Sequence, residues 1–414
     1  MSEEKKIKTA DASGRGTVAG FKVPFPGRQH AYSNDAIEAV VDVMRNAEGQ
    51  TQGTYLGKFE AAFKEHTGAN HTFGVDNCTN ALSIAATLCR LGPGDEVIIP
   101  AYTFCATAIP FGKTGAQIVW ADIDEKRRVV DPDDIERKIT SKTKAIVVVH
   151  LLGMPVDMPK VLAIAEKHNL RVVEDCAQAI GTSINCQNVG TFGDFGCFSF
   201  HGAKAMTTLG EGGMLTVKSD ADAKLVAKIR HNGCCLFEGD RQRYWDPAMS
   251  KVDVDPEMQV WPNNFCIGEA ACAAGIAELK HIDEYNDTLI AQANKLKKAL
   301  SDVEEISFHE IPEGYKNVYH QFVVHFDGSK IGKSRNDLMD ILVNDYKIRV
   351  IVQYYPLYRY PLFQKLGAGE YDCPVLEKWW DNTFSFPWWC GIDDETLDYL
   401  AISLKSAIAT LKNN

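Results

Sequence analysis

A lysine that could form a covalent link to a carbonyl compound stands between two apolar runs near the middle of the chain. Lys204 follows the run 195–200, and a glycine-rich turn, 210–213, separates it from the run 214–217. Such runs predict buried strands, and burying an ammonium group is costly unless chemistry uses it. A desolvated lysine has a lowered pKa and can attack an aldehyde as a neutral amine. Taken alone, the stretch favours the simpler interpretation, a lysine on an exposed loop.

Two polar residues follow another apolar run at the point where a strand should end. The run 170–174 predicts the strand, and Asp175 and Gln178 come directly after it. An acid that an apolar strand delivers to the edge of a sheet needs a partner. The protonated nitrogen of a pyridine ring is one such partner. The alternative is that Asp175 caps the segment that follows.

Two further segments follow predicted strands in the first third of the chain. Thr79 and Asn80 begin a predicted helix after the strand 72–76. The N–H groups of a helix start attract phosphate, although such side chains also cap their own helix. Phe104 follows the strand 96–100, where its ring could stack on a flat ligand or pack into the core. Each segment alone favours the structural interpretation.

These segments gain weight because they occur together. A phosphate turn, an aromatic ring, a strand-end acid, Ser199 and Lys204 are the groups that bind pyridoxal phosphate. They supply donors for the phosphate, a stacking partner, a carboxylate for the ring nitrogen and an amine for the aldehyde. No G-x-G-x-x-G follows the first strand, and neither G-x-x-x-x-G-K-[ST] nor G-x-S-x-G occurs. The combination therefore predicts a pyridoxal phosphate site rather than a dinucleotide or P-loop site.

The scaffold for these residues is predicted by alternating strand and helix patterns. The continuous apolar run 145–150 indicates a strand that is buried on both faces. The alternation predicts an α/β fold with a mainly parallel central sheet and helices on both faces, so that functional loops follow the carboxyl ends of strands. We expect an N-terminal arm at 1–24, a large cofactor-binding domain at 25–285 and a small α+β C-terminal domain at 286–414.

Composition limits the partners of this 414-residue chain. It is 45% hydrophobic and 24% charged, with a net charge of −11, which argues against a general nucleic-acid binder. No run is long and apolar enough to span a bilayer, and the polar residues 1–20 do not form a secretory signal. The 12 cysteines show no C-x-x-C spacing. We therefore expect reduced thiols, a cytoplasmic location, no membrane partner and no metal site.

In combination, the motifs resemble the DegT/DnrJ/EryC1/StrS aminotransferases. These are pyridoxal phosphate enzymes of fold type I that aminate keto- or aldehydo-sugars, with glutamate or glutamine as amino donor. The resemblance spans roughly residues 25–410. It rests on six segments: 77–82, 100–104, 150–153, 174–178, 199–204 and 210–213.

The resemblance implies a role for each site residue. Lys204 would form the Schiff base with the cofactor and then carry protons as general base and acid. Asp175 would pair with the pyridine nitrogen, Gln178 would lie near the ring hydroxyl, and Phe104 would stack on the ring. The implied phosphate ligands are Thr79, Asn80 and Ser199.

A segment further along the chain implies a homodimer with shared active sites. Asn264 stands where the family has an asparagine that reaches the phosphate in the neighbouring subunit. Two positions depart from the family pattern: Cys78 replaces a glycine of the phosphate turn, and Cys266 replaces an arginine. These departures concern the phosphate end of the site.

The substrate is indicated by a C-terminal segment. Many members that act on nucleotide-linked sugars carry a His-Tyr pair before the proline of this motif, whereas this chain has Gln353-Tyr-Tyr-Pro. The segment resembles branches acting on free cyclitols or sugar acids, one of which makes 8-amino-3,8-dideoxy-octulosonate for lipopolysaccharide. Tyr354 and Arg359 are candidate substrate contacts, and Arg241 or Arg243 could also meet a carboxylate. The alternative is that these arginines are solvated surface.

Three other functions remain as alternatives. The first is an aminotransferase for a nucleotide-linked 4-keto or 3-keto sugar. The second is a sugar dehydratase of the same fold, which the presence of Lys204 disfavours because dehydratases of the family carry histidine there. The third is a regulatory protein without catalysis, which the intact set of Lys204, Asp175 and Gln178 disfavours.

Overall fold

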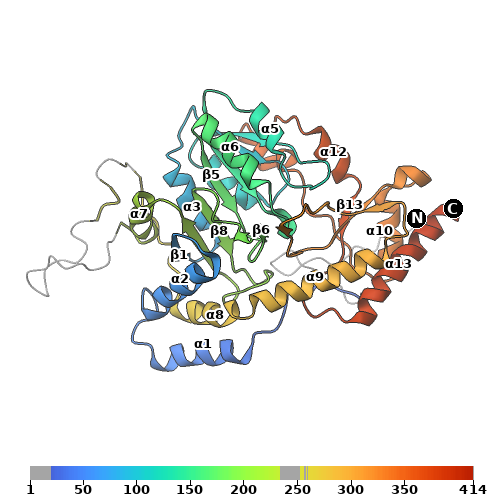
Figure 1. Cartoon of the computed structure of the whole chain (residues 1–414), viewed down its shortest axis with the longest axis horizontal. Helices are drawn as coiled ribbons and strands as arrows, with labels where there is room; N and C mark the ends of the chain where they lie inside the picture. Colours follow the sequence, from blue (N-terminus) through green and yellow to red (C-terminus); the bar gives the residue numbers. More distant parts are fainter. Residues whose placement is uncertain (1–19, 234–251, 256–257, 259, 414) are drawn as a thin grey trace, which may run out of the picture.

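A seven-stranded sheet forms the centre of the computed structural model, which describes residues 20–233, 252–255, 258 and 260–413 (Figure 1). Its order is β1 (His71–Val75), β9 (Gly213–Val217), β8 (Phe195–Ser199), β5 (Arg171–Asp175), β4 (Thr143–Val149), β2 (Glu96–Pro100) and β3 (Gln117–Ala121). Strand β9 is antiparallel to both neighbours, and the other described pairs of this sheet are parallel. The mainly parallel sheet is therefore confirmed, and every strand except β9 points its carboxyl end to the same edge.

The central strands are buried on both faces. In β4, every residue except Lys144 is buried, which is why the sequence there is a continuous run of small and β-branched residues. The helices that follow the strands cover the faces of the sheet. They are α3 (Cys78–Leu88), α4 (Ile109–Gly112), α5 (Pro132–Arg137), α6 (Met158–His168) and α7 (Asp220–Arg230).

Three helices from distant parts of the sequence pack together beside β1. Helices α1 (Asn34–Asn46) and α2 (Thr54–Thr67) both pack on α8 (Glu269–Leu279). The buried carboxylate of Glu269 accepts hydrogen bonds from the backbone N–H groups of Gly53, Tyr55 and Leu56, at 2.7–3.2 Å. One acid on α8 therefore satisfies the unpaired donors at the start of α2.

The C-terminal part has its own small antiparallel sheet of β10 (Ile306–Ser307), β12 (Val323–Phe326) and β13 (Thr383–Ser385). The long helices α9 (Ile282–Ala299) and α13 (Asp394–Asn413) pack along each other, and α10 (Arg335–Asn344) packs on α13 (Figure 1). A third, short sheet pairs β6 (Ser183–Ile184) with β7 (Gln187–Asn188) and with β11 (Tyr315–Lys316). It links the two parts of the chain.

The structure has one hydrophobic core around the central sheet and another in the C-terminal part. Each core includes residues from more than one of the three sequence ranges expected above. Leu357 and Trp379 pack in the core of the central sheet, so the segment with α11 (Pro361–Lys365) and α12 (Pro374–Trp380) returns to it, and α12 lies near α5 in Figure 1. Val23, from the expected arm, packs in the core of the C-terminal part. The expected boundary at 285/286 falls inside α9. Within the described ranges, no helix has the length and apolar character needed to cross a bilayer.

Candidate active site

A cavity of about 880 Å³ lies where the carboxyl ends of the strands meet the C-terminal part of the chain. Its walls come from the segments after β1, β2, β5 and β8, from residues 25–29, and from three C-terminal segments. Eight of the residues expected from sequence line it: Thr79, Asn80, Phe104, Asp175, Gln178, Ser199, Lys204 and Tyr354.

The start of helix α3 forms one end of this cavity. Asn77 is its N-cap, and the Asn77 side chain accepts a hydrogen bond from the Asn80 N–H at 2.9 Å. The Asn80 side chain in turn donates to Asp76 at 2.8 Å. The earlier N–H groups, of Cys78 and Thr79, have no acceptor within the helix. They remain available for an anion at the positive end of the helix dipole.

Asp175 lies at the floor of the cavity and both its carboxyl oxygens are held. Oδ2 accepts a hydrogen bond from Thr107 at 2.7 Å, and Oδ1 accepts one from the Ala177 N–H at 3.0 Å. Burial raises the pKa of Asp175, and these two bonds, with Lys204 and His150, act in the opposite direction. Each oxygen retains a lone pair, so the carboxyl can accept a further, preferably cationic, donor.

Gln178 is fixed from both ends of its amide. Its oxygen accepts from the Leu152 N–H at 2.6 Å, and its nitrogen donates to the Tyr354 hydroxyl at 2.7 Å. Leu152 has a left-handed backbone (φ 62°) inside the turn η2 (Leu151–Gly153), and that conformation presents its N–H. The motif 150–153 therefore holds Gln178, and Gln178 holds Tyr354, whose pKa burial raises to about 12.

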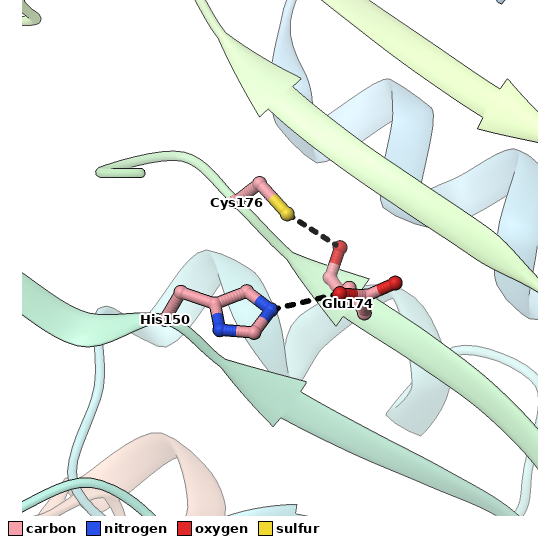
Figure 2. A group of neighbouring side chains, drawn as sticks. All are labelled: His150, Glu174 and Cys176. Carbon is pink, nitrogen blue, oxygen red and sulfur yellow. Dashed lines mark hydrogen bonds and ion pairs between the residues drawn. The ribbon is translucent and has the colours of Figure 1, made fainter. Parts of the chain in front are cut away.

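A buried cluster of His150, Glu174 and Cys176 lies at the end of β5, where Glu174 and Cys176 flank Asp175 in the sequence (Figure 2). Glu174 accepts hydrogen bonds from His150 at 2.9 Å and from the N–H groups of Gly190, Phe192 and Gly193 at 2.7–2.9 Å. The other ring nitrogen of His150 accepts from the Val156 N–H at 3.1 Å. Burial raises the pKa of the Cys176 thiol well above its usual range, which disfavours the metal-binding thiolate. The cluster is therefore internally satisfied and acts as a support for Asp175.

Lys204 lies on a loop that is closed like a hairpin. The Phe200 N–H donates to Gly212, the Gly202 N–H donates to Gly210, and the Lys204 N–H donates to His201, all at 2.8–2.9 Å. Ser199 ends β8 at the base of this loop. The lysine is therefore held beside the end of β8, and the simpler interpretation of an exposed surface loop is wrong for this segment because Lys204 lines the cavity.

Phe104 presents its ring to the cavity instead of packing in the core. Its side chain is 54% exposed, and its ring centre lies 5.9 Å from that of Tyr354. An aromatic face left open inside a cavity suits a flat ligand that would cover it.

Comparisons with known proteins agree with this geometry. Residues 31–405 match the model of the DegT/DnrJ/EryC1/StrS aminotransferase family. The chain belongs to this family. Among its relatives, a UDP-N-acetyl-3-dehydro-α-D-glucosamine 3-aminotransferase of Acidithiobacillus ferrooxidans is 34% identical over 84% of this chain and 87% of that protein. An L-glutamine:2-deoxy-scyllo-inosose aminotransferase of Micromonospora echinospora is 32% identical over 76% of this chain and 72% of its own length.

The fold is shared with solved structures as well. The aminotransferase from Psychrobacter cryohalolentis superposes with a TM-score of 0.85 at 25% identity, covering 95% of this chain and all of that one. The protein is thus an aminotransferase of fold type I, and its cofactor is pyridoxal phosphate. The cavity fits this cofactor, because it offers free N–H groups at α3, an open aromatic ring, a buried carboxyl with free lone pairs and Lys204.

Two residues expected at the site by resemblance to the family lie outside this cavity. Arg359 forms an ion pair with Glu377 and does not line the cavity. Asn264 forms a β-bridge with His231 and also lies outside it. Arg241 and Arg243 fall outside the described residues.

Several residues at the site were not expected from the sequence. Thr107 does not line the cavity but donates a hydrogen bond to Asp175, and His320, Arg349 and Gln29 line the cavity from distant segments. Burial, reinforced by Lys204, keeps the pKa of His320 well below its usual range, so its imidazole is neutral. No motif marked His320, Arg349 or Gln29, because these residues reach the cavity through long-range packing.

Proposed function

We propose that the protein is a sugar aminotransferase that moves an amino group from glutamate or glutamine to a keto- or aldehydo-sugar. The observation that carries the proposal is the single cavity that joins Lys204, Asp175 and Gln178 to a polar wall from the C-terminal part. Polar groups in this wall suit the hydroxyl groups of a polyhydroxylated acceptor.

The residues divide the work by chemistry. Bound pyridoxal phosphate supplies the electron sink for the C–H bond that is broken. The Lys204 amine takes the proton as general base and returns it as general acid. Asp175 would keep a proton on the ring nitrogen, and Phe104 would cover one face of the ring. The α3 N-terminus with Thr79, Asn80 and Ser199 would hold the phosphate.

For the acceptor we favour a free sugar acid, such as 8-oxo-3-deoxy-octulosonate for lipopolysaccharide. The support is the segment at Gln353, which lacks the His-Tyr pair, and the position of Tyr354 beside Gln178. A nucleotide-linked keto sugar is the second candidate, because the name of the Acidithiobacillus relative specifies one. A dehydratase is disfavoured by Lys204.

We also propose that two copies share their active sites and work in the cytoplasm. Asn264 lies outside its own cavity, and the nearby Trp261 is 92% exposed, as a residue that a second copy covers would be. Every cysteine that the structure describes is free, which fits a reducing compartment. Mixing Lys204→Ala chains with Asn264→Ala chains should restore activity if sites are shared, because one site per mixed dimer is then intact.

The decisive experiment measures consumption of the amino donor and formation of the amino sugar, in the wild type and in the Lys204→Ala variant. The wild-type holoenzyme should convert glutamate to 2-oxoglutarate, or glutamine to its 2-oxo acid, in step with amino-sugar formation. Lys204→Ala should abolish turnover, while Lys224→Ala, a substitution of an exposed lysine on α7, should leave it unchanged. Turnover by Lys204→Ala at the wild-type rate would refute the proposal.

A further inference from the structure

Arg349, in the wall of the active-site cavity, is a cation without a side-chain partner among the residues that the structure describes. It is half-buried, and its backbone N–H donates to Val23 at 3.0 Å. Within the described part of the chain, its guanidinium makes no hydrogen bond, ion pair or ring contact, which sets it apart from Arg359 and Arg335. A guanidinium is always charged, so partial burial without an acceptor is unfavourable until an anion binds.

The backbone around Arg349 is held in place. The Lys22 N–H donates to Lys347 at 2.8 Å, and Ile351 exchanges two hydrogen bonds with Ser385 of β13, at 2.7 and 3.1 Å. The segment therefore lies between the N-terminal residues and the small sheet. A side chain on such a fixed segment is preorganised for a ligand.

Three glutamines around the same cavity also have unsatisfied groups. The side-chain oxygens of Gln29, Gln321 and Gln353 are buried and have no donor within the described residues. All three line the cavity. Buried amide groups without partners are costly in an empty protein and are suited to the hydroxyl groups of a ligand.

The charged residues that line the cavity indicate which side chain would bind an anionic substrate. Lys204 and Arg349 are the two lysine or arginine side chains among the described residues that line the cavity. Lys204 is engaged by the cofactor, and His320 is neutral. Of the two acids in the lining, Asp175 is reserved for the cofactor ring, and Glu211 lies on the Lys204 loop. Among the described residues, the arginine is therefore the fixed positive charge that remains for a substrate.

We propose that Arg349 binds the carboxylate of the substrate, while Gln321 and Gln353 contact its hydroxyl groups. Planar guanidinium and carboxylate groups pair through two parallel hydrogen bonds. The inference rests on the proposed aminotransferase function and assigns the acid-binding role to Arg349 instead of Arg359. The carboxylate can belong to the amino donor or to a sugar-acid acceptor, since both occupy this cavity in turn.

The test compares Arg349→Gln and Arg349→Lys with Lys347→Gln, which removes an exposed charge two residues away. The donor arm compares glutamate with isoglutamine, in which the α-carboxylate is an amide. The acceptor arm compares an aldehydo-sugar acid with the neutral aldose of equal length. Arg349→Gln should lower kcat/KM about 10- to 100-fold for glutamate or for the sugar acid, with a small change for the matching isoglutamine or neutral aldose. Arg349→Lys should lie between, and Lys347→Gln should match the wild type.

The pattern of loss identifies the source of the carboxylate. A loss confined to the donor arm assigns Arg349 to the amino donor, and a loss confined to the acceptor arm assigns it to a sugar acid. Equal effects within both pairs, on glutamate and isoglutamine and on the sugar acid and the aldose, would overturn the proposal. Weaker cofactor binding with unchanged selectivity would also overturn it, because Arg349 would then serve the phosphate.

A binding measurement separates this inference from the proposed function. Calorimetry with glutarate on the wild-type holoenzyme needs no turnover. Arg349→Gln should weaken glutarate binding at least about tenfold. If the wild type aminates no sugar yet the glutarate difference holds, the function fails and the carboxylate site stands. If the wild type aminates sugars, but glutarate binding is unchanged and the sugar acid and the neutral aldose are affected equally, the carboxylate site fails.

Discussion

Gly213, the first residue of β9, lies directly against the backbone of Asn77, the N-cap of α3. A Cβ atom on Gly213 would lie 2.6 Å from the carbonyl carbon of Asn77 and 2.8 Å from the nitrogen of Cys78. The glycine-rich end of the Lys204 loop thus makes room for the turn that presents N–H groups to a phosphate. Two motifs more than 100 residues apart in the sequence are parts of one binding surface.

We expect Gly213→Ala to weaken cofactor binding by about tenfold or more. The added methyl group must displace backbone, not a flexible side chain, and overpacking of this kind costs about 1–3 kcal/mol. Titration of the cofactor-free protein with pyridoxal phosphate measures the effect. Gly202→Ala is the matched control, because its Cβ would have no neighbour closer than 3.8 Å. Equal affinities for the two variants would show that the turn tolerates the shift.

The pH dependence of cofactor binding should report on Asp175. Because burial raises its pKa, the cofactor-free folded chain holds this proton more tightly than the unfolded chain. The stability that protonated Asp175 contributes is fully present below the pKa of the unfolded chain, about 3.9. It is lost as pH rises through the higher pKa of Asp175 in the folded chain. When the cofactor is bound, its protonated ring nitrogen would pair with ionised Asp175 and offset this loss of stability. We expect the rise in Tm caused by pyridoxal phosphate to grow with pH across that window.

Asp175→Asn is the test of this linkage. The amide keeps the shape of the side chain but carries no charge, so the increase in cofactor stabilisation between pH 4 and pH 7 should be smaller than in the wild type. The rate constant kcat should fall on the order of 100-fold, because a fixed charge at the reacting system is lost. Identical pH profiles for the variant and the wild type would contradict the role of Asp175.

Glu174→Gln should destabilise the protein strongly. The carboxylate accepts four hydrogen bonds in a buried position, and one end of a glutamine amide would point its own N–H groups at donors. We expect the free energy of unfolding to fall by about 2–5 kcal/mol, measured by urea denaturation. Glu166→Gln, on the exposed face of α6, should change it little. A small effect at both positions would mean that the support of Asp175 lies elsewhere.

Arg359→Gln separates the two candidate arginines. Arg359 pairs with Glu377, which also accepts from the Tyr358 hydroxyl, and both ion-pair partners are about three-quarters buried. We expect a loss of stability of about 1 kcal/mol and kcat/KM values for acidic reactants close to those of the wild type. A selective loss for acids, equal to that expected for Arg349→Gln, would return the carboxylate site to Arg359.

The sequence determined the cofactor side of the site. Lys204, Asp175, Gln178 and Phe104 each follow an apolar strand, and parallel strands bring their carboxyl ends to one edge, so strand pattern and residue type were enough to bring them together. The motif 150–153 could be found but not explained, because its role is to hold Gln178 and Glu174, which depends on a left-handed turn and on buried hydrogen bonds.

The substrate side depended on tertiary structure. Arg349 and Arg359 lie ten residues apart in a segment without a regular period, and nothing local indicates which one reaches the cavity. Packing decides it: Glu377, on α12, pairs with Arg359. The Arg349 backbone donates a hydrogen bond to Val23, and the neighbouring Ile351 is bonded to Ser385 of β13, so the segment is held at the cavity. These partners are 18 to more than 300 residues away. Periodicity and residue type describe a chain's own neighbourhood, whereas a charge is paired or left free by whatever the fold places beside it.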